Sequence, residues 1–149
     1  MTTNSEVEIL LVEDNDNDAE MTLRALRKRN LANSLARVKD GAEALDFLFC
    51  RGGYTERENA HSPKVVLLDL HLPKIDGIEV LRTVRANPRT AQLPVVVLTS
   101  SNEEKDIIET YRLGVNSYIV KPVDFEKFID SVSSVGLYWL LLNQPPIAK

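Results

Sequence analysis

The sequence predicts a doubly wound α/β fold, in which one parallel sheet is covered by helices on both faces. Short apolar segments alternate with amphipathic segments along the whole 149-residue chain. Five strand and helix pairs in strict alternation favour parallel strands joined by crossover helices. With 44% hydrophobic and 27% charged residues, the composition is that of an ordinary globular domain. A sheet of this kind carries its site at the carboxyl ends of the strands.

The N-terminal half contains two predicted strand and helix pairs. Ile9–Val12 is an apolar run of strand length, and the apolar residues after the following acidic turn have helical spacing up to about Asn30. Leu35–Val38 is a weaker strand, and Gly41–Phe49 is a second helix. Residues 50–63 form one long connection, which we interpret as a mobile surface loop or a partner-binding insertion.

Three further pairs follow in the C-terminal half. Val65–Leu68 has the character of a fully buried strand, and a helix is predicted from Gly77 to about residue 84. The β-branched run 95–98 is the fourth strand, and the next helix is predicted to start within residues 101–104 and to stop at Gly114. Ser117–Val120 is the fifth strand. The apolar positions of the fifth helix are Phe125, Phe128, Ile129 and Val132.

Composition and charge exclude several classes of protein. The net charge of −4 and the lack of a basic cluster argue against a nucleic-acid partner. The single cysteine, Cys50, cannot form an intrachain disulfide. The N-terminus lacks the basic start of a signal peptide, and the longest apolar run, 136–142, is too short to cross a membrane. We therefore expect one cytoplasmic domain without a membrane anchor.

Charged and hydroxyl side chains follow four of the five predicted strands. They are Glu13 and Asp14 after the first strand, Asp69 after the third, Thr99 or Ser100 at the fourth and Lys121 after the fifth. Carboxylates gathered in this way disfavour one another's ionisation unless a cation intervenes, and hard oxygen ligands suit Mg²⁺. An aspartate screened by a metal and a lysine can attack phosphorus and form an aspartyl phosphate. Asp69 is the candidate nucleophile.

Plainer readings of these residues remain open. Glu13 and Asp14 could simply favour the start of the first helix, and Asp69 could be an ordinary turn residue. Thr99 suits the end of any strand, and Lys121 could be an exposed lysine. The four strand ends taken together favour a site.

Four motifs carry a resemblance to a known family. The segments VEDN, LLDLHLPKIDG, LTS and YIVKP occur in this order on the predicted elements. With them the chain resembles, over nearly its whole length, the receiver domain of bacterial two-component response regulators. The resemblance implies a flavodoxin-like sheet of strand order 2-1-3-4-5. It also implies a phosphorelay protein with no enzymatic activity beyond its own phosphorylation and slow dephosphorylation.

The resemblance implies a role for each residue of the site. Asp69 is expected to accept a phosphoryl group from a phosphohistidine of a partner sensor histidine kinase. Asp14 is expected to bind Mg²⁺ directly and Glu13 mostly through water, with the backbone carbonyl of His71 completing the ligands. Lys121 is expected to pair with a phosphoryl oxygen.

A switch is implied by two further matches. Thr99 and Tyr118 correspond to the hydroxyl and aromatic residues that move together on phosphorylation. The bond between Lys121 and Pro122 resembles one that is cis in the family.

The long connection and the tail suggest a subfamily. Residues 50–63 and the segment YWLLLNQPP resemble small regulators that partner cyanobacterial phytochrome histidine kinases and lack an output domain. Within the C-terminal extension 136–149, residues 137–142 are apolar on every side of any helix that they form, so they need a second surface. That surface is either the same domain or a second copy in a homodimer; the residues concerned are Leu137, Tyr138, Trp139 and Leu140.

Two other functions compete with the receiver. A Mg²⁺-dependent phosphohydrolase could use Asp69 as its nucleophile, but the haloacid dehalogenase type needs a second acid two residues later, where His71 stands. A flavodoxin-like cofactor binder needs a glycine- and hydroxyl-rich loop after the first strand, whereas EDNDND would repel phosphate.

Overall fold

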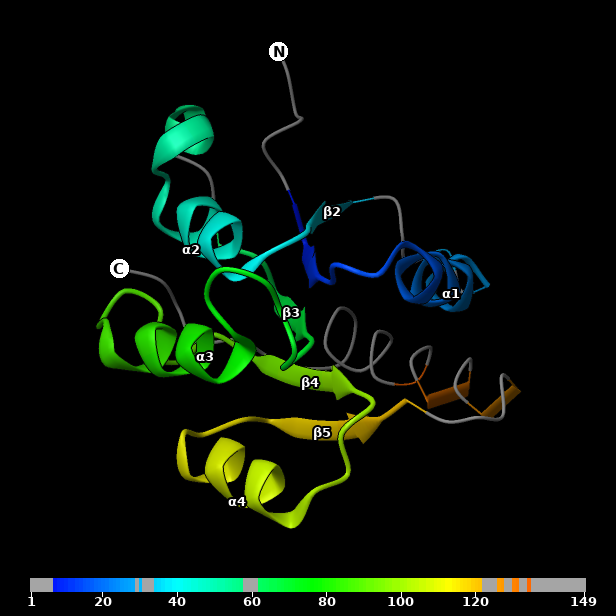
Figure 1. The fold of residues 1–149 in the computed structure, drawn as a ribbon. Coiled ribbons are helices and arrows are strands. Elements are labelled where there is room, and N and C mark those ends of the chain that lie inside the picture. Colours follow the sequence, from blue (N-terminus) through cyan, green and yellow to red (C-terminus); the bar gives the residue numbers. More distant parts are fainter. Residues whose placement is uncertain are drawn as a thin grey trace.

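Five parallel strands form a single sheet in the order β2-β1-β3-β4-β5 (Figure 1). The computed structural model describes residues 7–28, 30, 34–57, 62–121, 126–127, 130–131 and 134. The strands are β1 (Ile9–Val12), β2 (Leu35–Val38), β3 (Val65–Leu68), β4 (Val95–Thr99) and β5 (Ser117–Val120). The helices with bounds in these ranges are α1 (Asp16–Arg27), α2 (Gly41–Phe49), α3 (Gly77–Ala86) and α4 (Glu104–Arg112). The predicted fold class and strand order are confirmed.

Helices cover both faces of the sheet because successive strand residues point to opposite sides. Leu10 and Val12 of β1 pack in one core cluster with the apolar residues of α2 and α3. Ile9 and Leu11 pack in a second cluster with Ala25 and other residues of α1. The central strands β1, β3 and β4 are buried along their whole length. They give the site a rigid base.

Three helices begin with a capping side chain near the carboxyl end of a strand. Asn15, Asp40 and Asp76 each accept a hydrogen bond from the backbone N–H three residues later, at 2.8, 2.7 and 3.0 Å. Such caps satisfy N–H groups that a helix start leaves without partners. They fix the starts of α1, α2 and α3.

Helix ends differ from the sequence prediction by a few residues. The first helix ends at Arg27 with Lys28 as its C-cap, and the left-handed backbone of Asn30, with φ of 58°, lies beyond that end. The fourth begins at Glu104, at the end of the predicted start 101–104. The hydroxyl of Ser101 accepts from the N–H of Glu103 at 3.3 Å, so this serine orders the turn that precedes the helix. The predicted fifth helix falls mostly outside the described residues.

The start of the long connection folds back on α2. Residues Gly52–Arg57 form a short 3₁₀ helix, η1, within the connection that the sequence assigns to a surface loop or a partner-binding insertion. The Arg57 guanidinium lies 3.7 Å from the centre of the Phe47 ring and donates to the Phe47 carbonyl at 2.8 Å. The Tyr54 hydroxyl donates to Glu43 at 2.6 Å. Residues 58–61 lie outside the described part.

Candidate functional site

The predicted site residues follow strands whose ends are aligned in the sheet. Val12 of β1 pairs with Leu68 of β3, so Glu13 and Asp69 occupy equivalent positions just beyond the two strands. The ladder continues past them, since the Asp69 N–H donates to the Val12 carbonyl at 3.1 Å. The Lys121 N–H likewise donates to the carbonyl of Thr99 at 2.7 Å. The sheet therefore brings the side chains to one edge.

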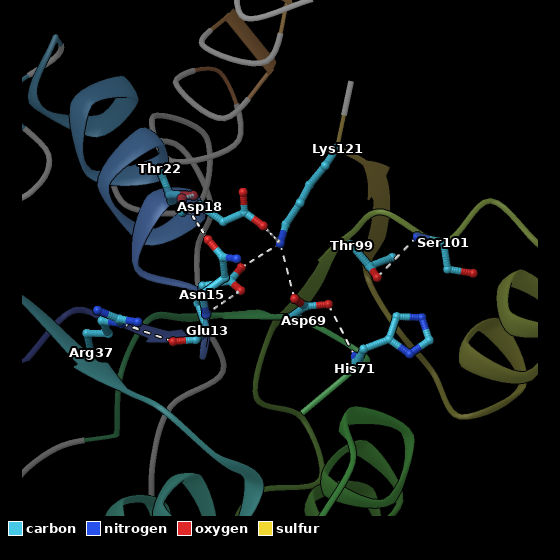
Figure 2. A network of polar contacts seen from close by, with 10 residues as sticks. All are labelled: Glu13, Asn15, Asp18, Thr22, Arg37, Asp69, His71, Thr99, Ser101 and Lys121. Carbon is cyan, nitrogen blue, oxygen red and sulfur yellow. Dashed lines mark hydrogen bonds and ion pairs between the residues drawn. The ribbon is translucent and has the colours of Figure 1, made fainter. Parts of the chain in front are cut away.

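The ammonium of Lys121 lies at the centre of this edge and contacts three carboxylates (Figure 2). Its Nζ is 2.6 Å from Glu13 Oε1, 2.9 Å from Asp18 Oδ2 and 3.1 Å from Asp69 Oδ2. The side chains of Lys121, Glu13 and Asp69 are at most 9% exposed, whereas that of Asp18 is 34% exposed. A buried ammonium is thus balanced by two buried carboxylates and one at the solvent edge.

Burial controls the ionisation of the innermost pair. Removal from water raises the pKa of Glu13 to about 7, although the hydrogen bond from Lys121 acts in the opposite direction. Burial on its own would lower the pKa of Lys121, but hydrogen bonds to Glu13 and Asp18 leave it above its ordinary value. Lys121 is therefore charged at neutral pH. Glu13 needs a cationic partner to remain a carboxylate.

Three carboxylates at the same edge fit a divalent metal ion. Glu13, Asp14 and Asp69 each offer an oxygen, and these oxygens lie within 4.8 Å of one another. Carboxylate oxygens are the ligands that hard divalent cations prefer, and Asp14 is exposed, which leaves the site open to water. A single ammonium cannot neutralise all the negative charge, so the donor set and its charge both favour a cation.

His71 follows the nucleophile candidate by two residues. Its N–H donates to Asp69 Oδ1 at 3.3 Å, and its side chain is exposed (Figure 2). This contact orients the carboxylate of Asp69 from the side opposite to Lys121. The predicted use of the His71 backbone carbonyl as a ligand stays a prediction.

The two predicted switch residues are connected through Ser101. Thr99 is fully buried, and its hydroxyl accepts from the N–H of Ser101 at 3.3 Å. The hydroxyl of Tyr118 donates to the carbonyl of Ser101 at 2.8 Å, and partial burial raises the pKa of this tyrosine. Ser101, which lies between β4 and α4, therefore contacts both side chains through its backbone. A shift of this backbone would affect both at once.

Sequence reasoning missed three residues of the site. Asp18 binds Lys121, and Asn15 caps α1 while its N–H donates to Glu13 Oε2 at 3.2 Å. Arg37 of β2 donates to the backbone carbonyl of Glu13 at 3.0 Å (Figure 2). The acidic run EDNDND contained the signal for Asp18, but nothing in the sequence distinguished this residue from its acidic neighbours.

Some predicted residues fall outside the described part of the chain. Pro122 is one of them, so the prediction for its peptide bond is untested. The proposed dimer residues, Leu137, Tyr138, Trp139 and Leu140, also lie outside. Among the described helices, each is too short or too polar to span a membrane.

The chain matches the response regulator receiver domain family over residues 9–133. It is 40% identical over 138 residues to the probable methanogenesis regulatory protein FilR2 of Methanothrix harundinacea, covering 93% of this chain and 86% of that protein. It is 39% identical over 132 residues to the response regulator Rcp1 of Synechocystis sp., covering 89% and 88%.

Solved structures agree with this match. The phosphorylated cyanobacterial phytochrome response regulator RcpA superposes with a TM-score of 0.86 at 37% identity, and Mn²⁺-bound Rcp1 with 0.85 at 38%; each comparison covers 95% of this chain and 99% of the other. The bacteriophytochrome response regulator AtBRR gives 0.74 at 50% identity, covering 93% and 99%. Because the family match spans most of the chain and these relatives are 37–50% identical to it, the chain belongs to the response regulator receiver domain family.

Proposed function

We propose that the chain is a phosphorelay receiver in which Asp69 accepts a phosphoryl group from a phosphohistidine of a sensor histidine kinase. The observation that carries the proposal is the contact of one buried ammonium, that of Lys121, with the carboxylates of Glu13 and Asp69. Receiver-domain response regulators are signalling proteins and not classical enzymes. The phosphohydrolase reading is therefore not favoured.

The proposed reaction is a transfer to an Asp69 oxygen. An O–P bond forms at Asp69 while the P–N bond to the donor imidazole breaks, and the electron pair of that bond stays with the imidazole. Mg²⁺ held by Asp14, Asp69 and the His71 carbonyl, and by Glu13 mostly through water, would screen the negative charge of the phosphoryl group. Lys121 donates to a phosphoryl oxygen from the position that it already occupies beside Asp69.

The proposed switch begins at the hydroxyl of Thr99. The phosphoryl group carries about two negative charges, so it attracts this hydroxyl. Because Thr99 and Tyr118 both contact Ser101, movement of Thr99 releases the Tyr118 hydroxyl and allows the ring to turn inward. The exposed apolar residues Ile108, Tyr111 and Val120 lie on α4 and β5, beside this switch. They form the surface whose presentation to partners would change.

Phosphorylation by a small donor tests the proposal directly. The protein is incubated with Mg²⁺ and acetyl phosphate, and the adduct is located by mass spectrometry. We expect one base-labile phosphoryl group on Asp69, its absence in Asp69→Asn and its absence in excess chelator. Asp40→Asn, which changes a carboxylate on the neighbouring helix cap, is the control and should be labelled normally. Multiple turnovers of a phosphomonoester, lost in Asp69→Asn, would instead support a phosphohydrolase.

The decay of the adduct tests the limited chemistry that we propose for the receiver. We expect slow self-dephosphorylation that depends on Mg²⁺. His71 and Ser101 stand where residues tune the lifetime of the aspartyl phosphate in the family. Substitutions there should change the decay rate, while Asp69 remains the labelled residue. Decay is measured from the remaining adduct after removal of the donor.

We further propose a phytochrome histidine kinase as the partner. Support comes from RcpA and AtBRR, which are phytochrome response regulators, and from the similarity of nearly the whole chain to them. The name of FilR2, by contrast, mentions methanogenesis and no phytochrome, so the identity of the partner kinase has to be tested by experiment. A purified phytochrome kinase labelled with ATP should transfer phosphate to this chain faster than a kinase without a phytochrome module. Equal transfer from both would contradict the proposal.

We also propose that the chain is cytoplasmic and forms a homodimer. Support comes from the apolar tail, whose residues Leu137, Tyr138, Trp139 and Leu140 exceed what one surface can cover, and from the net charge of −4, which disfavours nucleic acid. The mass in solution is measured with and without residues 137–149. A monomer in both cases would contradict the dimer.

A further inference from the structure

Among the described residues, Asp18 is the one carboxylate bound to Lys121 that does not belong to the metal cluster. It lies in the first turn of α1, and its Oδ2 is 2.9 Å from Lys121 Nζ. The cluster of carboxylate oxygens that could hold a cation contains Glu13, Asp14 and Asp69, but not Asp18. Two of the three partners of Lys121 are therefore shared with a metal site, and the third is independent of it.

All three N–H groups of the Lys121 ammonium are in use. A lysine ammonium has three donors, and Lys121 directs them at Glu13, Asp18 and Asp69. If Asp69 directly and Glu13 mostly through water held a divalent cation, that cation would repel the ammonium, which would lose part of its negative environment. Asp18 is then its strongest remaining partner.

We propose that Asp18 is a positioning residue, which holds the ammonium of Lys121 on the α1 side of the site and so leaves Glu13 and Asp69 available to Mg²⁺. Without the Asp18 carboxylate, Lys121 pairs only with Glu13 and Asp69. An ammonium at these oxygens competes with the metal for them. The inference rests on the proposed function for its biological meaning, but its central test measures metal binding alone.

The exposure of Asp18 suits this role. Its side chain is 34% exposed, compared with 1% for Glu13, so it can follow a small displacement of the ammonium without loss of core packing. Its N–H is held by the Asn15 cap and its carbonyl accepts from the Thr22 hydroxyl at 3.0 Å. The backbone is therefore fixed and the carboxylate alone is left to move.

A double-mutant cycle separates an effect through Lys121 from a direct effect on the metal. Mg²⁺ affinity is measured by calorimetry for the unmodified chain, Asp18→Asn, Lys121→Met and the double variant. Coupled neighbouring charges lead us to expect roughly three- to tenfold weaker binding for Asp18→Asn, and less than a roughly twofold change for the same substitution in Lys121→Met. An equal change in both backgrounds, or none in either, would overturn the proposal.

A matched control tests for a general charge effect. Glu20→Gln removes one negative charge from the same helix, but Glu20 pairs only with Arg24 and Arg27 among the described residues. We expect it to leave Mg²⁺ affinity unchanged, and an effect as large as that of Asp18→Asn would overturn the proposal. Asp18→Ser serves as a second variant should the first fail to fold, and thermal unfolding checks both.

Phosphorylation gives a second measurement. At saturating Mg²⁺, Asp18→Asn is expected to be labelled by acetyl phosphate several times more slowly, because Lys121 is no longer held in place. If the unmodified chain is not labelled at Asp69, the proposed receiver function fails while the Mg²⁺ cycle still decides the role of Asp18. If labelling is normal but the cycle shows no coupling, the receiver stands and the role of Asp18 is wrong.

Discussion

Gly77 packs directly against the backbone of Asp69. A Cβ atom at position 77 would lie 2.2 Å from the carbonyl oxygen of Asp69 and 2.6 Å from the Cα of Leu70. The Gly77 N–H also donates to the Leu70 carbonyl at 2.8 Å. The start of α3 is thus pressed onto the segment that carries the candidate phosphoacceptor, and only glycine permits this approach.

Substitution of this glycine should disturb stability and site together. We expect Gly77→Ala to lower the free energy of unfolding by about 1–3 kcal/mol, because the methyl group forces the backbone of Asp69 or α3 to move. Labelling of Asp69 should slow as well. Urea unfolding and the acetyl phosphate assay measure the two effects. Gly53→Ala is the control, since a Cβ there meets no atom within 4 Å; equal losses in both variants would refute this account.

The sequence was sufficient to predict the strands and the residues that follow them. Glu13, Asp69 and Lys121 could be placed together because carboxyl ends of parallel strands share one edge, and the structure shows them in contact. Asp18 could not be selected in this way. Its contact with Lys121 depends on the angle at which α1 packs on the sheet, and four acids within six residues look alike in the sequence.

The long connection shows the same limit. Its length predicts only a surface loop or a partner-binding insertion. The packing of Arg57 on the Phe47 ring joins residues ten apart through a side-chain contact that no local pattern predicts. Tertiary contacts of single side chains thus account for most of what the sequence left open.

Arg85 should be important for the turn before β5. Its guanidinium donates to the carbonyls of Leu93 and Gly114, at 2.7 and 2.8 Å, and so joins α3 to the ends of β4 and α4. We expect Arg85→Ala to lower the free energy of unfolding by about 1.5–3 kcal/mol, the usual cost of losing hydrogen bonds to a charged group. Arg85→Lys should recover only part of the lost stability, because an ammonium lacks the planar, forked set of N–H donors of a guanidinium.

Denaturant unfolding of three variants measures this contribution. Arg112→Ala, at the exposed end of α4, is the control and should change stability by less than about 0.5 kcal/mol. A full recovery by lysine, or a loss as large in Arg112→Ala, would show that the fork geometry of Arg85 is irrelevant.

Tyr118 should be easier to turn inward without its hydroxyl. The bond to the Ser101 carbonyl at 2.8 Å holds the ring in its present position. A hydrogen bond of this kind contributes about 0.5–1.5 kcal/mol, so Tyr118→Phe should raise the inward population by about two- to tenfold. Ring contacts with Thr99, measured by NMR in the unphosphorylated protein, report the population. Tyr111→Phe, on an exposed tyrosine, should leave those contacts as they are; unchanged contacts in Tyr118→Phe would count against the proposed switch.

The docking of η1 on α2 should make stability depend on alkaline pH. Burial, together with the hydrogen bond to Glu43, raises the pKa of Tyr54 to about 12, from an ordinary value of 10.0. The folded state therefore keeps a proton that the unfolded state loses first. The contribution of Tyr54 is complete below pH 10 and is lost as the pH rises toward about 12.

A comparison of two proteins isolates this contribution from that of the lysines. Urea midpoints are measured for the unmodified chain and for Tyr54→Phe at a series of pH values between 9 and about 11.5, both sides of the pKa of an ordinary tyrosine. The difference in urea midpoint between the two proteins should shrink across this range, because phenylalanine cannot ionise and keeps its ring against Phe47. A constant difference would mean that the Tyr54 hydroxyl is open to water in solution, and that η1 is not held on α2 through Glu43.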